Sequence, residues 1–152
     1  MIKLLQKEEN IFYLGRKIDY ISMLEGSLKL KEISYIHSEA MPAGELKHGT
    51  ISLVTEHMPV IAVATQEDLF DKTISNVKEV KARGAKVIMI CKENAEYDRE
   101  TVDYAIKLPV ADNIFMPIIT AIPLQLIAYY TSVLKGCDVD KPRNLAKSVT
   151  VE

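Results

Sequence analysis

The sequence predicts an α/β fold, a three-layer αβα sandwich around a five-stranded, mainly parallel sheet. Short apolar runs alternate with longer amphipathic stretches, and glycines stand where two of those longer stretches end. The chain has 152 residues, the usual size of one domain with a substantial core. We therefore expect a single folding unit of the flavodoxin-like or Rossmann-like kind.

Five apolar runs predict the strands of this sheet. The second run is less apolar than the others and follows directly from a predicted helix. The runs cover residues 11–15, 35–40, 60–65, 86–91 and 104–108.

Three longer stretches, residues 18–34, 67–83 and 117–135, predict crossover helices, and Gly84 and Gly136 stand near the ends of the last two. The segment 114–134 carries no charged side chain and is nearly long enough to span a bilayer. Prolines and a glutamine interrupt it, so we expect a buried or interface helix and no membrane partner.

The two chain ends differ from the central region. Residues 1–10 mix Lys and Glu with Leu and show no secretory signal, which predicts a linker or a leading helix. We expect the domain over residues 11–139. Residues 140–152 begin with a polar, turn-forming stretch and then lose any clear periodicity, so composition alone predicts a frayed tail.

Charge and cysteine content exclude several classes of protein. Charged residues make up 26% of the chain and the net charge is −2, so we expect no nucleic-acid partner. Cys91 and Cys137 lack CxxC spacing, which favours free thiols in a reducing cytoplasm. The three histidines are scattered and form no ligand pattern, so we expect neither a metal site nor a cofactor.

Charged residues interrupt the helix predicted over residues 18–34. At about 100° per residue, Ile21, Leu24 and Leu28 form an apolar stripe that we expect to face the sheet, and Glu32 falls inside it. Residues three and four apart are neighbours on a helix, so Glu25, Lys29 and Glu32 can form one carboxylate–ammonium–carboxylate patch. A structural row of ion pairs and a functional site both remain open.

A second candidate lies in a predicted loop between Gly44 and Gly49. Glycines permit tight backbone turns, and the imidazole of His48 is suited to moving protons near neutral pH. A solvated loop histidine is the alternative. We interpret His37 and His57 as structural or surface residues.

Several segments resemble a known enzyme family. LEGSLKLKEISYIHSEAMPAGELKHGTISL (24–53) and KPRNLAKSVTVE (141–152) resemble the second sugar-isomerase (SIS) module of glutamine:fructose-6-phosphate aminotransferase, isomerising. YLGR (13–16) and PLQLIAYY (123–130) also resemble this family. The resemblance covers the chain from Ile11 onward and implies an SIS fold acting on fructose 6-phosphate and forming glucosamine 6-phosphate.

The resemblance also implies roles for individual residues. Lys147 matches the lysine that forms a Schiff base with open-chain fructose 6-phosphate, which makes residues 140–152 an active-site tail. Ala146 matches a sugar-contacting backbone position beside it. Glu32 matches the carboxylate that carries a proton between C1 and C2, and Lys29 would keep that carboxylate ionised.

Two further positions acquire roles in the same way. His48 matches the histidine associated with opening the sugar ring, which the family takes from the neighbouring subunit, so a homodimer is implied. Glu25 matches a further acidic residue at the substrate.

The chain departs from the complete family enzyme in ways that predict a fragment. It shows no terminal-cysteine glutaminase and no Ser/Thr-rich phosphate loop of the first SIS module, so we expect the isolated chain to turn over weakly or not at all. Lys17 and Thr50 are smaller departures that alter local turns. A non-catalytic regulatory SIS module that binds sugar phosphate is the alternative function.

Overall fold

A computed structural model describes residues 1–143 and 145 of the chain. Five strands form one sheet in the order β2-β1-β3-β4-β5, and every pairing is parallel. The expected α/β sandwich and its five strands are therefore confirmed. The strands are β1 (Asn10–Gly15), β2 (His37–Pro42), β3 (Pro59–Ala64), β4 (Lys86–Lys92) and β5 (Tyr104–Leu108).

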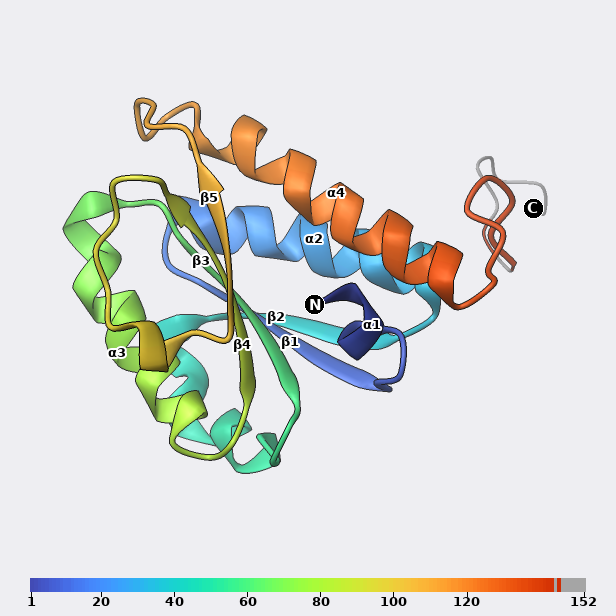
Figure 1. Ribbon diagram of the computed structural model, residues 1–152, viewed down its shortest axis with the longest axis horizontal. Helices are drawn as coiled ribbons and strands as arrows, with labels where there is room; N and C mark the ends of the chain where they lie inside the picture. The colour runs from blue at the N-terminus through green and yellow to red at the C-terminus, as the bar shows by residue number, and fades with distance from the viewer. Residues whose placement is uncertain (144, 146–152) are drawn as a thin grey trace, which may run out of the picture.

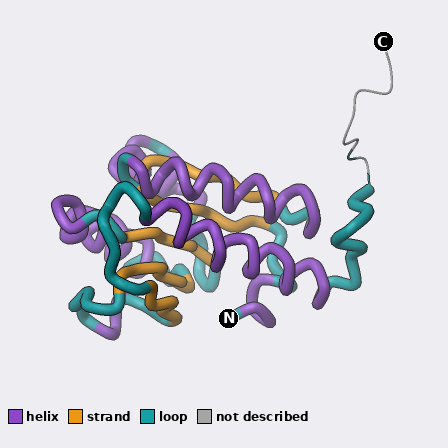
Figure 2. The backbone as a smooth tube through the Cα atoms, turned by 90° about the horizontal axis from the view of Figure 1, so that it is seen from above, coloured by secondary structure: helices purple, strands orange, loops and turns teal. Residues whose placement is uncertain are grey.

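Helices cover both faces of the sheet. Figure 1 shows α2 (Ile18–Ser34) and α4 (Met116–Leu134) along one face and α3 (Phe70–Lys81) along the other. Figure 2 shows two long helices lying side by side over the strands, in agreement with the packing of α2 on α4. The remaining helical segments are short: α1 (Ile2–Leu5) and the 3₁₀ turns η1 (Ala43–His48), η2 (Thr50–Leu53), η3 (Glu67–Leu69) and η4 (Arg99–Thr101).

Alternation along the strands divides the core into two layers. In β1, Tyr13 packs with residues of α2 and α4, whereas Phe12 and Leu14 pack with residues of α3 and η1. β1 and β3 are buried on both sides, as expected of central parallel strands. Leu5 of α1 is also fully buried in the layer beneath α4.

Element boundaries differ from the sequence prediction at a few ends. β2 begins at His37 because Tyr35 adopts a left-handed conformation (φ 61°) that ends α2. The stretch predicted as one helix over 67–83 starts as the 3₁₀ turn η3, and α3 ends at Lys81. Gly84 follows with φ +85°, a conformation that L-residues rarely adopt.

The predicted orientation of α2 is wrong. Ile21, Leu24 and Leu28 do not face the sheet, because they are 59%, 43% and 43% exposed. The buried face is formed mainly by smaller residues, which let α2 lie close to both the sheet and α4. At Gly26, for example, an added Cβ would lie only 2.9 Å from a side-chain methyl carbon of Leu124. The buried residues of α2 are Asp19, Ser22, Met23, Gly26, Ser27, Leu30 and Ser34.

Within the part of the chain that the structure describes, α4 is the one helix long and apolar enough to cross a membrane. Core helices of other proteins meet the same criterion, so this is weak evidence for a membrane span. Leu124, Ile127 and Ala128 of α4 are buried against the sheet and α2. Pro123 lies inside the helix and is buried as well.

Candidate active site

Glu25, Lys29 and Glu32 form a row along the outer side of α2. The Lys29 Nζ atom lies 2.6 Å from Glu32 Oε2 and 3.8 Å from Glu25 Oε1. The predicted carboxylate–ammonium–carboxylate patch is therefore confirmed. Its side chains are partly exposed, so the row lies on the surface and not against the core as the sequence analysis had placed it.

The charges in this row define what Lys29 can do chemically. The hydrogen bond to Glu32 raises the pKa of Lys29, and the nearby charges of Glu32 and Glu25 act in the same direction. Lys29 therefore remains an ammonium group at neutral pH. It can orient the Glu32 carboxylate and stabilise nearby negative charge, but it is a poor base or nucleophile.

His48 lies on the opposite side of the sheet from this row. It ends η1, a short 3₁₀ turn rather than the loop expected from the sequence, and its side chain is exposed. Ala43 and Leu46 of η1 pack in the core layer of α3, whereas α2 covers the other face of the sheet. Within one chain, the fold therefore does not bring His48 to Glu32.

Lys147 and Ala146 lie outside the described residues. The described chain ends close to the carboxyl end of α2, the end that carries Glu32. There the Arg143 N–H donates to the Tyr35 hydroxyl at 2.8 Å, and the Arg143 guanidinium lies 4.3 Å from the centre of the Tyr35 ring. This contact attaches residue 143 to the residue that follows α2.

A buried carboxylate that the sequence pattern did not indicate, Asp19, lies in the first turn of α2. It is 2% exposed and accepts hydrogen bonds from the Thr65 N–H, at 2.8 Å, and from the Thr65 hydroxyl. Burial raises the pKa of Asp19, and the hydrogen bonds from Thr65 and Gln66 partly oppose that shift. The detectable signal was an acidic residue just after the turn that joins β1 to α2.

Lys92 at the end of β4 is a second buried charge that the sequence did not reveal. It is 4% exposed, and its Nζ donates to Glu67 Oε1 at 2.9 Å and to Asn113 Oδ1 at 2.8 Å. It borders a hollow of about 210 Å³ at the carboxyl ends of β3 and β4. Asp19 and Lys92 thus both lie at the edge of the sheet where ligands of such folds commonly bind.

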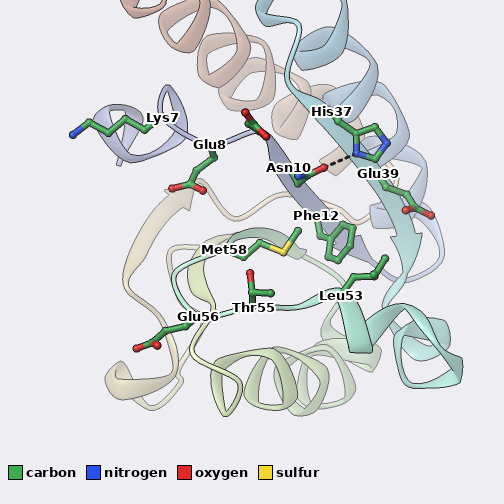
Figure 3. A pocket seen from close by; sticks show the side chains of 11 residues that line it. Lys7, Glu8, Asn10, Phe12, His37, Glu39, Leu53, Thr55, Glu56 and Met58 are labelled. Atoms are coloured by element: carbon green, nitrogen blue, oxygen red, sulfur yellow. Dashed lines mark hydrogen bonds between the residues drawn. The ribbon is translucent and has the colours of Figure 1, made fainter.

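A hollow of about 520 Å³ lies at the opposite, amino-terminal edge of the sheet. Figure 3 shows Phe12 and Met58 in it, together with Glu8, Glu39 and Glu56, and the hydrogen bond between His37 and Asn10. None of the residues predicted for catalysis lines this hollow. The outer side of α2 therefore remains the candidate site, open to solvent in a single chain.

Side chains of the kinds that bind metal ions do not cluster in the described part of the chain. Over residues 1–143 and 145, no group of three His, Cys, Asp or Glu side chains could hold a metal ion. Cys91 and Cys137 are both free thiols, and burial raises the pKa of Cys91.

Comparison with known proteins places this geometry in a family. A family model described as SIS domain matches residues 4–135. Glutamine–fructose-6-phosphate aminotransferase (isomerising) of Clostridium tetani is 61% identical over 145 residues, which cover 95% of this chain and 24% of that protein. The protein of the same name from Caldanaerobacter subterraneus is 60% identical over 144 residues, with the same coverage.

A solved structure supports the same assignment. The C-terminal domain of glucosamine-fructose-6-phosphate aminotransferase from Francisella tularensis matches with a TM-score of 0.85 and 41% identity, over 92% of this chain and 40% of that one. The chain thus spans about a quarter of the length of the curated relatives it matches. Because the family match covers most of the chain and the fold agrees, this chain belongs to the SIS domain family.

Proposed function

We propose that this chain is the second isomerase module of a glutamine–fructose-6-phosphate aminotransferase, which converts fructose 6-phosphate to glucosamine 6-phosphate with ammonia from glutamine. The observation that carries the proposal is 61% identity over 95% of the chain to a protein of that name. In the Glu25–Lys29–Glu32 row, Glu32 would carry the proton and Lys29 would be the fixed cation of such an isomerisation.

In the proposed mechanism, the Lys147 amine attacks C2 of the open-chain ketose and water leaves, which forms an imine. The product carries the nitrogen of ammonia, so ammonia must then displace the lysine at C2. The imine acidifies the C1 protons. Glu32 takes one of them to give an enolamine and returns it to C2. The proton of the C1 hydroxyl is lost as the C1 carbonyl forms and the nitrogen gains one, which leaves an aldehyde at C1 and an amine at C2.

The geometry on α2 supports the role proposed for Glu32. A carboxylate acting as a base must be oriented before the substrate arrives, and a hydrogen bond from an ammonium group at 2.6 Å holds it in one position. Lys29 can also stabilise negative charge that develops on the enolamine oxygen. Glu25 and the backbone of Ala146 would contact the sugar.

His48 would reach the substrate from the neighbouring subunit and open the sugar ring. In one chain His48 lies beyond the opposite face of the sheet from α2, so a second copy is the simplest source of an imidazole beside Glu32. This arrangement implies a homodimer with composite sites.

The rest of the reaction would belong to other modules. The relatives are about four times as long as this chain, which leaves room for a glutaminase and for a first SIS module that binds the phosphate. Within this chain we assign residues 11–139 to the SIS domain and 140–152 to the active-site tail. We propose a cytoplasmic enzyme without nucleic-acid or membrane partners, which also suits the two free thiols.

Borohydride trapping tests the proposal in the full-length parent enzyme. Reduction in the presence of fructose 6-phosphate should attach the sugar to Lys147, and Lys147→Met should abolish both the label and product formation. Glu32→Gln should lower kcat by about 100-fold or more while the label on Lys147 persists, because imine formation does not require that base. Glu96→Gln, an exposed carboxylate outside the row, is the matched control.

Three results would reject or replace this assignment. Label on another lysine, or full activity in Lys147→Met, would reject it. Binding of fructose 6-phosphate without any formation of glucosamine 6-phosphate would favour the non-catalytic regulatory module. An ordinary turnover rate from the isolated 152 residues would contradict the need for the missing modules.

A further inference from the structure

The strand order places the topological switch point of this sheet between β1 and β3. From β1 the chain continues outward to β2 on one side, and from β3 to β4 and β5 on the other. In open α/β sheets, ligands bind outside the carboxyl ends of the strands at this point. Here this point lies between the turn after Gly15 and the turn after Ala64.

Asp19 is buried at this switch point. Its two carboxylate oxygens accept from the N–H and the hydroxyl of Thr65, and the Gln66 side-chain amide lies 3.4 Å from one of them. Among the described residues, no Lys, Arg or His nitrogen lies within 4.0 Å of the carboxylate. A buried carboxylate is thus held by neutral donors alone.

The donors that hold the Asp19 carboxylate could equally hold the oxyanion of a bound ligand. A carboxylate without a cation is costly to bury unless its hydrogen bonds are satisfied, and the amino end of α2 adds only a partial positive charge. A backbone N–H, a hydroxyl and an amide that converge at the carboxyl edge of a sheet also bind the phosphate groups of ligands in other proteins. Thr65 and Gln66 present that set and direct it at Asp19.

A hollow and a cation lie near the donors of Thr65 and Gln66. The hollow of about 210 Å³ is lined by Thr65 and Asn94, by the pair Lys92–Glu67, whose charged atoms lie 2.9 Å apart, and by Asp71. Arg16, in the turn after β1, donates to the neutral Asn76 side chain, and no described carboxylate lies within 4.0 Å of its guanidinium. Space therefore adjoins the donors, and the turn after β1 carries the Arg16 cation.

We propose that Asp19 is a built-in anion that fills a latent oxyanion site at the switch point of this domain. The site would accept inorganic phosphate or a similar small oxyanion once the carboxylate is removed. In the native chain, the Asp19 carboxylate prevents an anionic ligand from binding at the switch point. This inference does not depend on the proposed function.

Titration of the 152-residue chain with inorganic phosphate tests the proposal by amide NMR. The Thr65 and Gln66 amide signals of the native chain should stay in place up to about 10 mM phosphate, with chloride used to keep the ionic strength constant. In Asp19→Ala and Asp19→Ser the same signals should shift and saturate in the millimolar range. Asp68→Ala removes an exposed carboxylate at the same edge and should behave like the native chain.

A thermal measurement covers variants that fold poorly. Phosphate should raise the Tm of either Asp19 variant in a concentration-dependent way, because a ligand of the folded state stabilises it, and should leave the native Tm unchanged. Saturable binding at Thr65 in the native chain would overturn the proposal. So would Asp19 variants that show neither shifted signals nor a raised Tm, or an equal response from Asp68→Ala.

Discussion

Lys17 holds the most unusual backbone conformation at the start of α2. As the residue before the helix it adopts φ 48° and ψ −120°, a combination that an L-side chain rarely tolerates and that glycine adopts freely. Its ammonium group pairs with Asp68 at 3.1 Å, but the two side chains are 69% and 61% exposed. An exposed pair of this kind contributes little to stability, so the backbone strain is not offset by the contact.

Lys17→Gly should therefore stabilise the domain. We expect the free energy of unfolding to rise by about 1 kcal/mol, since relief of the strain exceeds the entropy lost by a glycine. Urea denaturation would measure the difference. Lys17→Ala keeps the Cβ and removes only the ion pair, so it should not stabilise the domain. If Lys17→Ala raised the free energy of unfolding as much as Lys17→Gly, the effect would come from the charge and not from the backbone conformation.

At the scale of elements, Asp103 joins α3, β4 and the start of β5. Its carboxylate binds Lys81 and Lys86 and accepts the Val87 N–H at 2.8 Å. Burial alone would raise the pKa of Asp103, but the hydrogen bonds from Lys81, Val87 and Lys86 outweigh it and the pKa falls below its ordinary value. This edge of the sheet is therefore stabilised by an ionised carboxylate.

The contribution of Asp103 should depend on pH with a defined sign. Because its pKa is lower in the folded state, its stabilisation is complete above the unfolded pKa near 3.8 and disappears as the pH falls through the folded value. Asp103→Asn should cost about 2 kcal/mol of unfolding free energy at pH 7 and much less in strong acid.

Denaturant unfolding at several pH values measures this difference. Asp140→Asn, which changes an exposed aspartate near the end of the described chain, should show no comparable pH-dependent loss. If Asp103→Asn lowered the free energy of unfolding by the same amount at every pH, the stabilisation would come from the packing of the side chain and not from its charge.

At the scale of the whole molecule, α2 and α4 together present an apolar surface to solvent. The two helices pack side by side on one face of the sheet. Both carry exposed apolar side chains, which on α2 lie next to the charged row. Isolated exposed apolar residues are common, but many of them on two adjacent helices are typical of an interface. The group comprises Ile21, Leu24, Leu28, Ile118, Ile122, Leu126, Tyr129, Tyr130 and Val133.

The isolated chain should accordingly self-associate through this surface. Light scattering should give a mass above that of one chain, and the double variant Ile21→Glu, Ile122→Glu should return it to the monomer value because burying two carboxylates opposes association. Leu53→Glu alters an equally exposed leucine on η2 and should leave the mass unchanged. A monomeric native chain would contradict the prediction.

Local pattern was sufficient for the strands, for the long helices and for the charged row on α2. Strand and helix periodicities concern neighbours along the chain, and residues three and four apart meet on any helix, so Lys29 and Glu32 could be paired before the fold was known. The resemblance of segments 24–53 and 141–152 identified the aminotransferase family from the sequence as well.

Tertiary structure alone decided which way α2 faces and which distant groups meet. The apolar stripe of Ile21, Leu24 and Leu28 indicated a buried face, but close packing against the sheet and α4 selected the smaller residues instead. The bond between Asp19 and Thr65 joins residues on different elements, and His48 and Glu32 are separated by the sheet itself. No periodicity encodes these relations, because they arise from how whole elements pack and not from the order of residues within one of them.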